Sequence, residues 1–203
     1  MSGDVPENVS RETFERLKTY EALLKQWNPK INLVSRSTLD DAWTRHFQDS
    51  IQVEAILPAD TRTLADLGSG GGFPGLVLAI LFAETRPDAQ VTLIESDQRK
   101  CTFLRTVLRE TGVGARILPE RIEKVPRLGV DVITARALAP LTQLLEHAER
   151  HLRPGGHAYF LKGAQFRAEI EEALATWAFS REEIPSTTSP EAAILKIGDL
   201  ARV

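Results

Sequence analysis

The chain has 203 residues, of which 42% are hydrophobic and 26% charged, and its formal net charge at pH 7 is −3. This composition is typical of a globular protein with one sizeable core, and the acidic balance argues against binding nucleic acid through bulk electrostatics. The single cysteine excludes a disulfide framework and a cysteine-based zinc site, so we expect no metal and a reducing, cytoplasmic setting. No apolar run approaches the ~20 residues that cross a bilayer, and the first ten residues lack the apolar segment of a signal peptide, so we expect neither membrane insertion nor export.

The first sixty residues carry the pattern of two helices. The first is predicted over 10–27, where Ser10 can cap the N-terminus and Pro29 ends the helix. The second is predicted from Ser37 to about Leu57, and its inner face is formed by apolar residues at helical spacing: Trp43, Phe47, Ile51 and Ala55. We expect residues 1–60 to form a helical extension over the pocket of a domain that spans 61–203.

Two polar pairs lie on the predicted second helix. Arg45 and Asp49 stand four residues apart, and we expect them to form an ion pair along the helix. His46 and Ser50 share a face at the edge of the apolar stripe, where an ordinary half-buried histidine is the simplest interpretation.

From residue 62 onward, strand-like apolar runs alternate with helical patterns, which predicts a mostly parallel sheet with helices on both faces. Strands are expected near 62–67, 90–95, 114–118, 130–135 and 156–162, and helices near 74–84, 97–111, 138–152 and 164–176. The runs 177–184 and 192–197 are expected to close the sheet as a hairpin, since a Ser/Thr/Pro segment separates them. The predicted fold is α/β and doubly wound, with seven strands and a ligand beyond their carboxyl ends.

The stretch 62–75 is the most biased part of the chain, and it lies between a predicted strand and a predicted helix. Gly68, Gly70, Gly71 and Gly72 lack Cβ atoms, so their backbone N–H groups can approach a ligand closely. Such a strand-to-helix turn predicts a ligand at the N-terminus of the following helix.

Two nucleotide-type ligands compete for this turn. Gly70, Gly72 and Gly75 satisfy the dinucleotide pattern G-x-G-x-x-G, and Glu95 follows at about the 20-residue interval of that pattern. Asp66, directly before the glycines, favours S-adenosylmethionine, because a carboxylate suits its ammonium and sulfonium groups better than a pyrophosphate. The acidic residue that ends the second strand, Glu95, would then bind the ribose hydroxyls.

Three further positions end strands or follow them at the same edge of the sheet. Ile122 and Glu123 follow the third strand, where they could border an adenine ring; a surface Arg-Glu pair at 121 and 123 is the alternative. Arg136 ends the fourth strand and could hold a phosphate or a guanine edge, or else an ion pair with Asp66 or Glu123. Lys162 ends the fifth strand and suits a substrate oxygen or phosphate, unless it merely extends to solvent.

Two methyl-transfer chemistries are disfavoured by what the sequence lacks. A pyrimidine-C5 methyltransferase needs a thiolate at the active edge, whereas Cys101 lies within a predicted helix and is interpreted as core filler. Adenine-N6 enzymes usually present Asn/Asp-Pro-Pro-aromatic after the fourth strand, where this chain has 135–138, Ala-Arg-Ala-Leu. An acceptor with a free lone pair, such as guanine N7, needs only alignment and charge neutralisation.

Five separated motifs in this order resemble the RsmG family, also called glucose-inhibited division protein B: 27–33 (WNPKINL), 45–50 (RHFQDS), 66–75 (DLGSGGGFPG), 135–137 (ARA) and 161–163 (LKG). The resemblance covers about residues 10–170. It implies a class I, Rossmann-like fold and methylation of guanine N7 in the 530 loop of bacterial 16S ribosomal RNA, with S-adenosylmethionine as methyl donor and S-adenosylhomocysteine as product.

The resemblance also implies roles for individual residues. It places Gly68, Phe73, Ile122, Glu123 and Arg136 at the cofactor, beside Asp66, Gly70 and Glu95 from the turn itself. Arg136 and Lys162 are expected at the reacting centre, and Arg45, His46 and Lys162 against the RNA. We expect a monomer acting on 16S rRNA, within the 30S subunit. A small-molecule methyltransferase and a non-catalytic RNA-binding assembly factor are the alternatives.

Overall fold

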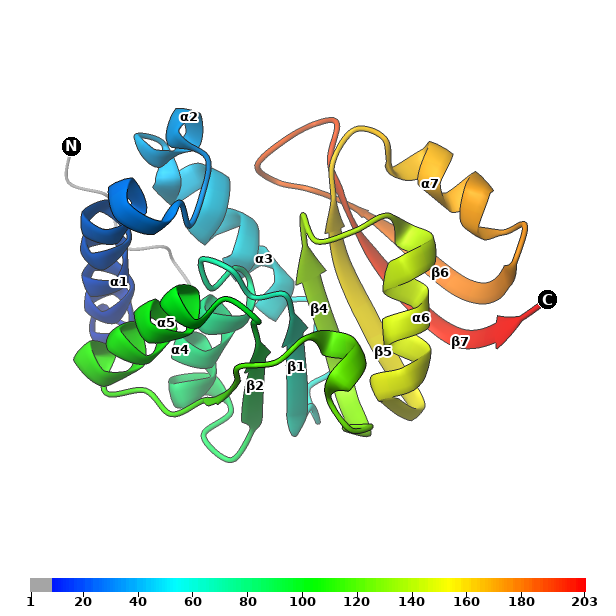
Figure 1. Ribbon diagram of the computed structural model, residues 1–203, viewed down its shortest axis with the longest axis horizontal. Coiled ribbons are helices and arrows are strands. Elements are labelled where there is room, and N and C mark those ends of the chain that lie inside the picture. The colour runs from blue at the N-terminus through cyan, green and yellow to red at the C-terminus, as the bar shows by residue number, and fades with distance from the viewer. Residues whose placement is uncertain (1–8) are drawn as a thin grey trace.

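The computed structural model describes residues 9–203 and has a seven-stranded sheet at its centre (Figure 1). The strand order is β3-β2-β1-β4-β5-β7-β6, and the strands are parallel except for β7, which runs antiparallel to both β5 and β6. This confirms the predicted doubly wound fold with a closing hairpin. The strands are β1 (Thr63–Leu67), β2 (Gln90–Ile94), β3 (Arg116–Leu118), β4 (Val130–Arg136), β5 (Leu152–Lys162), β6 (Trp177–Pro185) and β7 (Ala193–Arg202).

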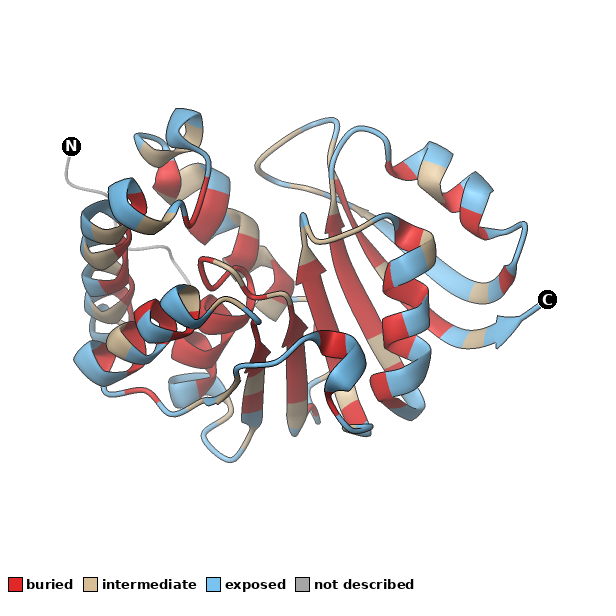
Figure 2. Cartoon of the chain, in the orientation of Figure 1, coloured by how far each residue is buried: buried red, intermediate tan, exposed pale blue. Residues whose placement is uncertain are grey.

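Helices cover both faces of the sheet, because strand residues alternate between two apolar faces. Leu64, Val132 and Tyr159 belong to the cluster on the face with the N-terminal helices, α4 (Gly75–Thr85) and α5 (Gln98–Thr111). Ala65 and Phe160 belong to the cluster on the face with the 3₁₀ turn η2 (Ile122–Lys124), α6 (Leu141–His151) and α7 (Phe166–Ala173). Figure 2 shows the central strands buried from both sides.

The first helix, α1 (Arg11–Ile31), is longer than predicted. Ser10 caps it as expected, since its side chain accepts a hydrogen bond from the Thr13 backbone N–H at 3.2 Å. The prediction that Pro29 ends the helix is wrong, because Pro29 lies in its last turn. The helix ends at Asn32, which has the left-handed conformation, and the buried Asn28 side chain accepts hydrogen bonds from the N–H groups of Leu33 and Val34 that follow.

The predicted second helix is broken into three pieces: α2 (Arg36–Leu39), the π-helical segment η1 (Trp43–Gln48) and α3 (Asp49–Glu54). The start predicted at Ser37 is also wrong, because Ser35 occupies the N-cap position. A π turn is wider than an α turn and rotates the face that follows it. Of the predicted apolar stripe, Phe47 is fully buried, Trp43 and Ile51 are half-buried, and Ala55 is exposed. The other buried positions between 42 and 57 are Ala42, His46, Ser50, Val53 and Leu57.

The N-terminal helices share one hydrophobic cluster with α4 and α5. Within it, the Tyr20 ring stacks on Phe73 of the glycine-rich turn at 5.2 Å and meets the edge of Phe47 at 4.9 Å. The division of the chain near residue 60 therefore stays a prediction, and residues 1–8 of the predicted extension lie outside the described part. Among residues 9–203, no helix has the length and apolar character needed to cross a membrane.

Candidate functional site

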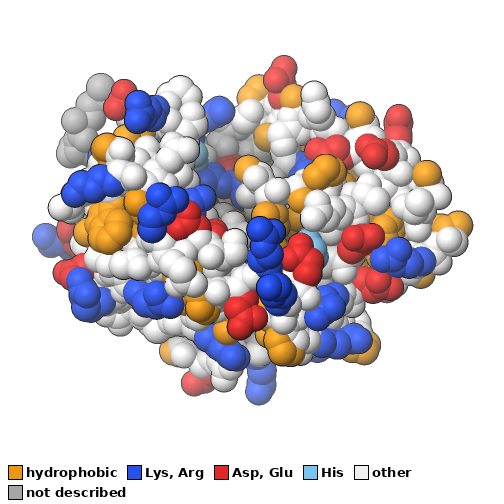
Figure 3. All heavy atoms as spheres, in the orientation of Figure 1, with side chains coloured by type: hydrophobic (Ala, Val, Ile, Leu, Met, Phe, Trp, Pro, Cys, Tyr) orange, Lys and Arg blue, Asp and Glu red, His pale blue; other side chains and the backbone are white. Residues whose placement is uncertain are grey.

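A cavity of about 1130 Å³ opens at the carboxyl ends of the parallel strands, between the N-terminal helices and the hairpin of β6 and β7. Figure 3 shows the surface hollowed at this place, with basic side chains near the opening. Ten of the eleven site residues predicted from the sequence line it: Arg45, His46, Gly68, Gly70, Phe73, Glu95, Ile122, Glu123, Arg136 and Lys162. The exception is Asp66.

The glycine-rich turn packs closely against the N-terminal helices and the segment that follows α1. Gly72 has a φ of +98°, and a Cβ there would lie 2.4 Å from the Tyr20 hydroxyl oxygen. A Cβ on Gly71 would lie 3.1 Å from the Leu33 carbonyl oxygen. The Tyr20 hydroxyl donates a hydrogen bond to the Gly71 carbonyl. Gly71 and Gly72 therefore have little room for a side chain, and Gly68, Gly70 and Gly71 border the cavity with their backbone.

Glu95 ends β2 and borders the cavity while being only 8% exposed. One carboxylate oxygen accepts from the Gly70 N–H at 2.8 Å, and the other accepts from the Asp97 N–H at 2.7 Å. The carboxylate thus holds the glycine-rich turn against β2. Its position at the cavity wall fits the predicted contact with ribose hydroxyls, which would add to these backbone bonds.

Asp66 lies behind the turn instead of in the cavity wall. Its side chain is fully buried, and Oδ1 accepts from the Thr134 hydroxyl on β4 at 2.7 Å. A Cβ on Gly75 would approach the Asp66 Cβ to 2.4 Å, so helix α4 starts directly against it. Burial raises the pKa of Asp66 to about 6. This geometry favours support of the turn over the predicted direct contact with a cationic ligand.

The far wall of the cavity is formed by η2. Ile122 is buried and Glu123 is exposed, and both line the cavity as predicted. The Glu123 carboxylate lies 3.9 Å from Nε2 of His147 on α6. Arg121 and Glu123 do not form an ion pair with each other in the described part of the chain, so the alternative of a surface Arg–Glu pair is wrong. The wall is apolar at Ile122 and polar at its rim, which suits the edge of an adenine ring.

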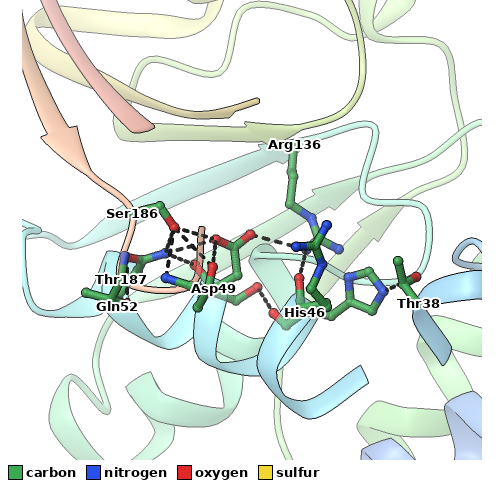
Figure 4. A network of polar contacts seen from close by, with 10 residues as sticks. Thr38, His46, Asp49, Gln52, Arg136, Ser186 and Thr187 are labelled. Atoms are coloured by element: carbon green, nitrogen blue, oxygen red, sulfur yellow. Dashed lines mark hydrogen bonds and ion pairs between the residues drawn. The ribbon is translucent and has the colours of Figure 1, made fainter. Parts of the chain in front are cut away.

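Arg136 at the end of β4 is held by an aromatic ring on one face and by two oxygens at one end of its guanidinium. Its guanidinium carbon lies 4.8 Å from the centre of the Phe73 ring, and Nη1 donates to the Arg45 carbonyl at 3.1 Å. Nη1 also lies 3.4 Å from Asp49 Oδ2 (Figure 4). The predicted ion pair along the helix between Arg45 and Asp49 is therefore wrong, because Asp49 turns to Arg136. The two partners proposed for Arg136, Asp66 and Glu123, are replaced by Asp49.

Lys162 reaches the cavity but is held by the protein. Its side chain is 10% exposed, and Nζ lies 2.6 Å from Glu169 Oε2 on α7 and 3.1 Å from the Ala139 carbonyl. Glu169 Oε2 also accepts from the Leu141 N–H at 2.8 Å. Lys162 does not simply extend to solvent. It joins the end of β5 to α6 and α7, and its predicted contact with substrate stays a prediction.

His46 and Arg45 lie on the N-terminal side of the cavity. The His46 ring is buried, stands 5.2 Å from the Phe73 ring, and its Nε2 lies 2.8 Å from the Thr38 hydroxyl. Burial, followed by the charges of Arg136 and Arg45, lowers the pKa of His46 to about 4, so the ring is neutral at pH 7. His46 is thus more buried than predicted, whereas the Arg45 side chain is exposed and available to a partner.

Several functional positions had no clear signal in the sequence. The sequence indicates Asp49 only as a partner for Arg45, and it gives no separate signal for Glu169, which lies within the predicted helix 164–176. The connection between β6 and β7, at 186–192, was recognised as a loop by its composition, but its place in the cavity wall was not. Each of these positions depends on contacts between segments far apart in the sequence.

Cys101 does not line the cavity. Within residues 9–203, no group of three His, Cys, Asp or Glu side chains is arranged to hold a metal ion. Cys101 is fully buried, and its Sγ donates to the Glu95 carbonyl at 3.1 Å. Burial raises the pKa of this thiol, which agrees with its interpretation as core filler.

Comparisons with known proteins bear on family and fold. The family model GidB, described as rRNA small subunit methyltransferase G, matches residues 13–195. Proteins named ribosomal RNA small subunit methyltransferase G are similar over nearly the whole length. The one from Ruegeria sp. (strain TM1040) is 52% identical over 201 residues, covering 99% of this chain and 98% of its own. The one from Rhodospirillum centenum is 53% identical over 193 residues, covering 95% and 87%.

Solved structures share the fold at low sequence identity. A TehB-like SAM-dependent methyltransferase from Corynebacterium glutamicum has a TM-score of 0.58 at 16% identity, covering 89% of this chain and 98% of that one. Fibrillarin from Aeropyrum pernix, solved with natively bound S-adenosyl-L-methionine, has a TM-score of 0.57 at 17% identity, covering 76% and 75%. These likenesses confirm the Rossmann-like architecture predicted from the sequence.

Proposed function

The chain belongs to the GidB family, described as rRNA small subunit methyltransferase G, and on this premise we propose that it transfers a methyl group from S-adenosylmethionine to N7 of a guanine in the 530 loop of 16S rRNA. The observation that carries the proposal is the convergence in one cavity of the glycine-rich turn, Glu95 and Arg136. The family supports methylation of small-subunit rRNA. The guanine N7 target is inferred from the chemistry of the site and from the resemblance.

The residues present fit S-adenosylmethionine at the end of the cavity formed by the glycine-rich turn. Gly68 and Gly70 would offer close backbone approach to its amino-acid part, Glu95 would bind the ribose hydroxyls, and Ile122 and Glu123 would border the adenine. Phe73 would cover one side, as its ring already does for Arg136. The cofactor would supply an electrophilic methyl group, and the protein would orient it.

The acceptor end of the cavity suits a base that needs no proton removed. Arg136 is fixed there by Phe73, the Arg45 carbonyl and Asp49, and its planar group can donate to guanine O6 or to a phosphate. His46 is neutral at pH 7, so it adds polarity without charge. Transfer would depend on alignment of N7 with the methyl group and on neutralisation by Arg136, with no general base.

RNA binding would use a few cations at the rim instead of a basic surface. Arg45, Lys100 and Arg121 line the cavity without an ion pair among the described residues. Because the whole chain is acidic, with a formal charge of −3, we propose a structured target recognised by shape, the 16S rRNA of the 30S subunit. We further propose that the protein works in the bacterial cytoplasm as a monomer.

The proposal is tested by methyl transfer from labelled S-adenosylmethionine to 30S subunits and to deproteinised 16S RNA, both from cells that lack this gene. Label at one guanine N7 within the 530 loop is the expected result. Efficient methylation of free nucleosides or other small molecules without RNA would instead support a small-molecule methyltransferase. Tight cofactor-dependent RNA binding without a product would support an assembly factor.

The role of Arg136 is tested in the same assay. Arg136→Ala is expected to lower kcat/KM by at least ~100-fold, because the transition state loses its fixed cation. Arg116→Ala, at an exposed position on β3 outside the cavity, is the matched control and should retain wild-type activity. Circular dichroism must show both variants folded. Activity of Arg136→Ala within threefold of wild type would refute a catalytic role for the guanidinium.

A further inference from the structure

The carboxylate of Asp49 connects two walls of the cavity that are far apart in the sequence. Oδ2 faces the Arg136 guanidinium at 3.4 Å. Oδ1 accepts from the Gln52 amide at 2.9 Å and from the Thr188 hydroxyl at 3.1 Å, and it lies 3.4 Å from the Ser186 hydroxyl. Figure 4 shows this network, with Asp49 between Arg136 on one side and the β6–β7 connection on the other.

Gln52, one turn further along α3, strengthens the second of these contacts. Its Oε1 accepts from the Thr187 backbone N–H at 2.9 Å and from the Thr187 hydroxyl at 3.1 Å. Its Nε2 lies 3.3 Å from the Ser186 hydroxyl. Asp49 and Gln52 together therefore satisfy three consecutive residues of the connection.

The hairpin holds the two ends of the connection, since the Ser186 N–H donates to the Ala192 carbonyl at 3.1 Å, whereas the side-chain hydrogen bonds that join it to another part of the described chain come from α3. Ser186, Thr188 and Ser189 are half-buried and polar, Thr187 and Pro190 are exposed, and none of the five belongs to an apolar cluster. Ser186, Thr188 and Ser189 nevertheless line the same cavity as Arg136. Hydrogen bonds to α3 therefore fix the position of this wall.

We propose that Asp49 is a positioning residue for methyl transfer, which holds Arg136 on Phe73 and the 186–189 segment against α3, so that both walls of the acceptor end keep one geometry. The inference rests on the proposed function. Asp49 touches neither the methyl donor nor the reacting nitrogen in this scheme; it acts through Arg136 and through the hydroxyl groups of the connection. A displacement of Arg136 would misalign the acceptor base, whereas a displacement of the connection would weaken the hold on the RNA.

The two arms of the network can be cut separately. Asp49→Asn keeps the size of the side chain but places an amide between a guanidinium and the Gln52 amide, so one N–H group must face another donor. We expect kcat on 16S substrate to fall ~30-fold, because Arg136 loses its fixed orientation. Gln52→Ala leaves the Arg136 contact intact, so we expect a rise of ~5-fold in KM for the RNA with kcat nearly unchanged.

Controls separate positioning from general stability. Gln26→Ala removes an exposed amide on α1, away from the cavity and from the Asp49 network, and it should behave as wild type. Calorimetry with S-adenosylmethionine should give a Kd for Asp49→Asn within ~3-fold of wild type, since the glycine-rich turn is untouched. Asp49→Glu, which restores the charge, should recover part of kcat.

The outcomes are distinct. If the wild type methylates 16S rRNA, and Asp49→Asn and Gln52→Ala both stay within twofold of it in kcat and KM, the inference about Asp49 is refuted and the proposed function is not. The inference is also refuted if both variants lose activity only in proportion to their loss of thermal stability, without a fall in kcat for Asp49→Asn and a rise in KM for Gln52→Ala. A wild-type chain that gives no product on 16S rRNA would overturn the proposed function and this inference with it.

Discussion

The two ends of the cavity are built from different kinds of contact. At the cofactor end, one short stretch of glycines supplies the backbone, and its main brace, Glu95, lies 25 residues from Gly70. At the acceptor end, Arg136 and Asp49 are 87 residues apart, and Ser186 and Asp49 are 137 apart. The first end is encoded in a compact motif, whereas the second exists only when distant segments meet.

The energetic consequences differ as well. At the cofactor end, Gly71 packs against Leu33 and Gly72 packs against Tyr20 and Leu76, so an added methyl group at either glycine produces a steric clash. The acceptor end depends on half-buried charged pairs, where removal of one partner leaves the other without compensation. Substitutions at the cofactor end should therefore act through steric clashes, and substitutions at the acceptor end should act through unpaired charges.

The largest expected effect is at the cofactor end. Gly72→Ala places a Cβ 2.4 Å from the Tyr20 hydroxyl and 2.9 Å from the Leu76 Cβ, at a φ of +98°. We expect a loss of about 2–4 kcal/mol in the free energy of unfolding and at least ~100-fold weaker cofactor binding. Urea unfolding and calorimetry measure the two. Gly114→Ala, where a Cβ meets nothing within 4 Å, is the control. Wild-type values for Gly72→Ala would show that the turn is not sterically closed.

The buried carboxylate of Asp66, behind the glycine-rich turn, should affect how the stability of the protein depends on pH. The pKa of Asp66 rises from 3.8 to about 6 on folding, so between these values the folded state binds more protons than the unfolded state. This group therefore lowers stability as pH increases from 4 to 6, by roughly 2–3 kcal/mol in total, and adds no further change above that. Asp66→Asn should remove this decline relative to wild type.

Urea unfolding at pH 4, 5, 6 and 7 measures the difference between wild type and Asp66→Asn. Asp60→Asn, at an exposed aspartate outside the site, is the control and should follow the wild-type curve. If the curves for wild type and Asp66→Asn run parallel across this range, the carboxylate beneath the turn does not take up a proton on folding.

At the acceptor end, the pair of Lys162 and Glu169 offers a test of charge against shape. Lys162→Met keeps the aliphatic stem but removes the cation beside Glu169, which retains only the Leu141 N–H as a partner, and this should cost about 1–2 kcal/mol of stability. The double variant with Glu169→Gln should recover most of that loss. If the double variant recovers both stability and methyl transfer, the role of Lys162 is to connect β5 with α6 and α7. If it recovers stability but not methyl transfer, Lys162 contacts the substrate as the sequence predicted.

The smallest effect is expected at the rim. Arg45→Gln removes an exposed cation whose backbone carbonyl, and not its side chain, holds Arg136. Affinity for 16S RNA should fall several-fold at low salt, and the slope of log K against log salt should decrease by about 1. Arg116→Gln, on β3 away from the cavity, should leave the slope unchanged. An unaltered slope in Arg45→Gln would remove this residue from the RNA contacts.

The failures of prediction in the N-terminal region have one cause. Local patterns placed a helix end at Pro29 and one regular helix over 37–57, whereas packing of α1 against α4 and α5 carried the helix past the proline. The π turn at Trp43–Gln48 brings His46 and Phe47 together into the core next to Phe73. Propensity and spacing cannot anticipate such adjustments, because the contacts that favour them come from outside the segment.

The sequence by itself determined the alternation of strands and helices, the glycine-rich turn and the ends of β2, β4 and β5 as the site, since each depends on neighbouring residues and on the rule that parallel strands end together. The tertiary structure decided what each charge does. It moved Asp66 behind the turn, paired Arg136 with Asp49 and Lys162 with Glu169, and brought the β6–β7 connection to the cavity. The reason is that a buried charge takes the partner that folding places beside it, and sequence distance does not reveal that partner.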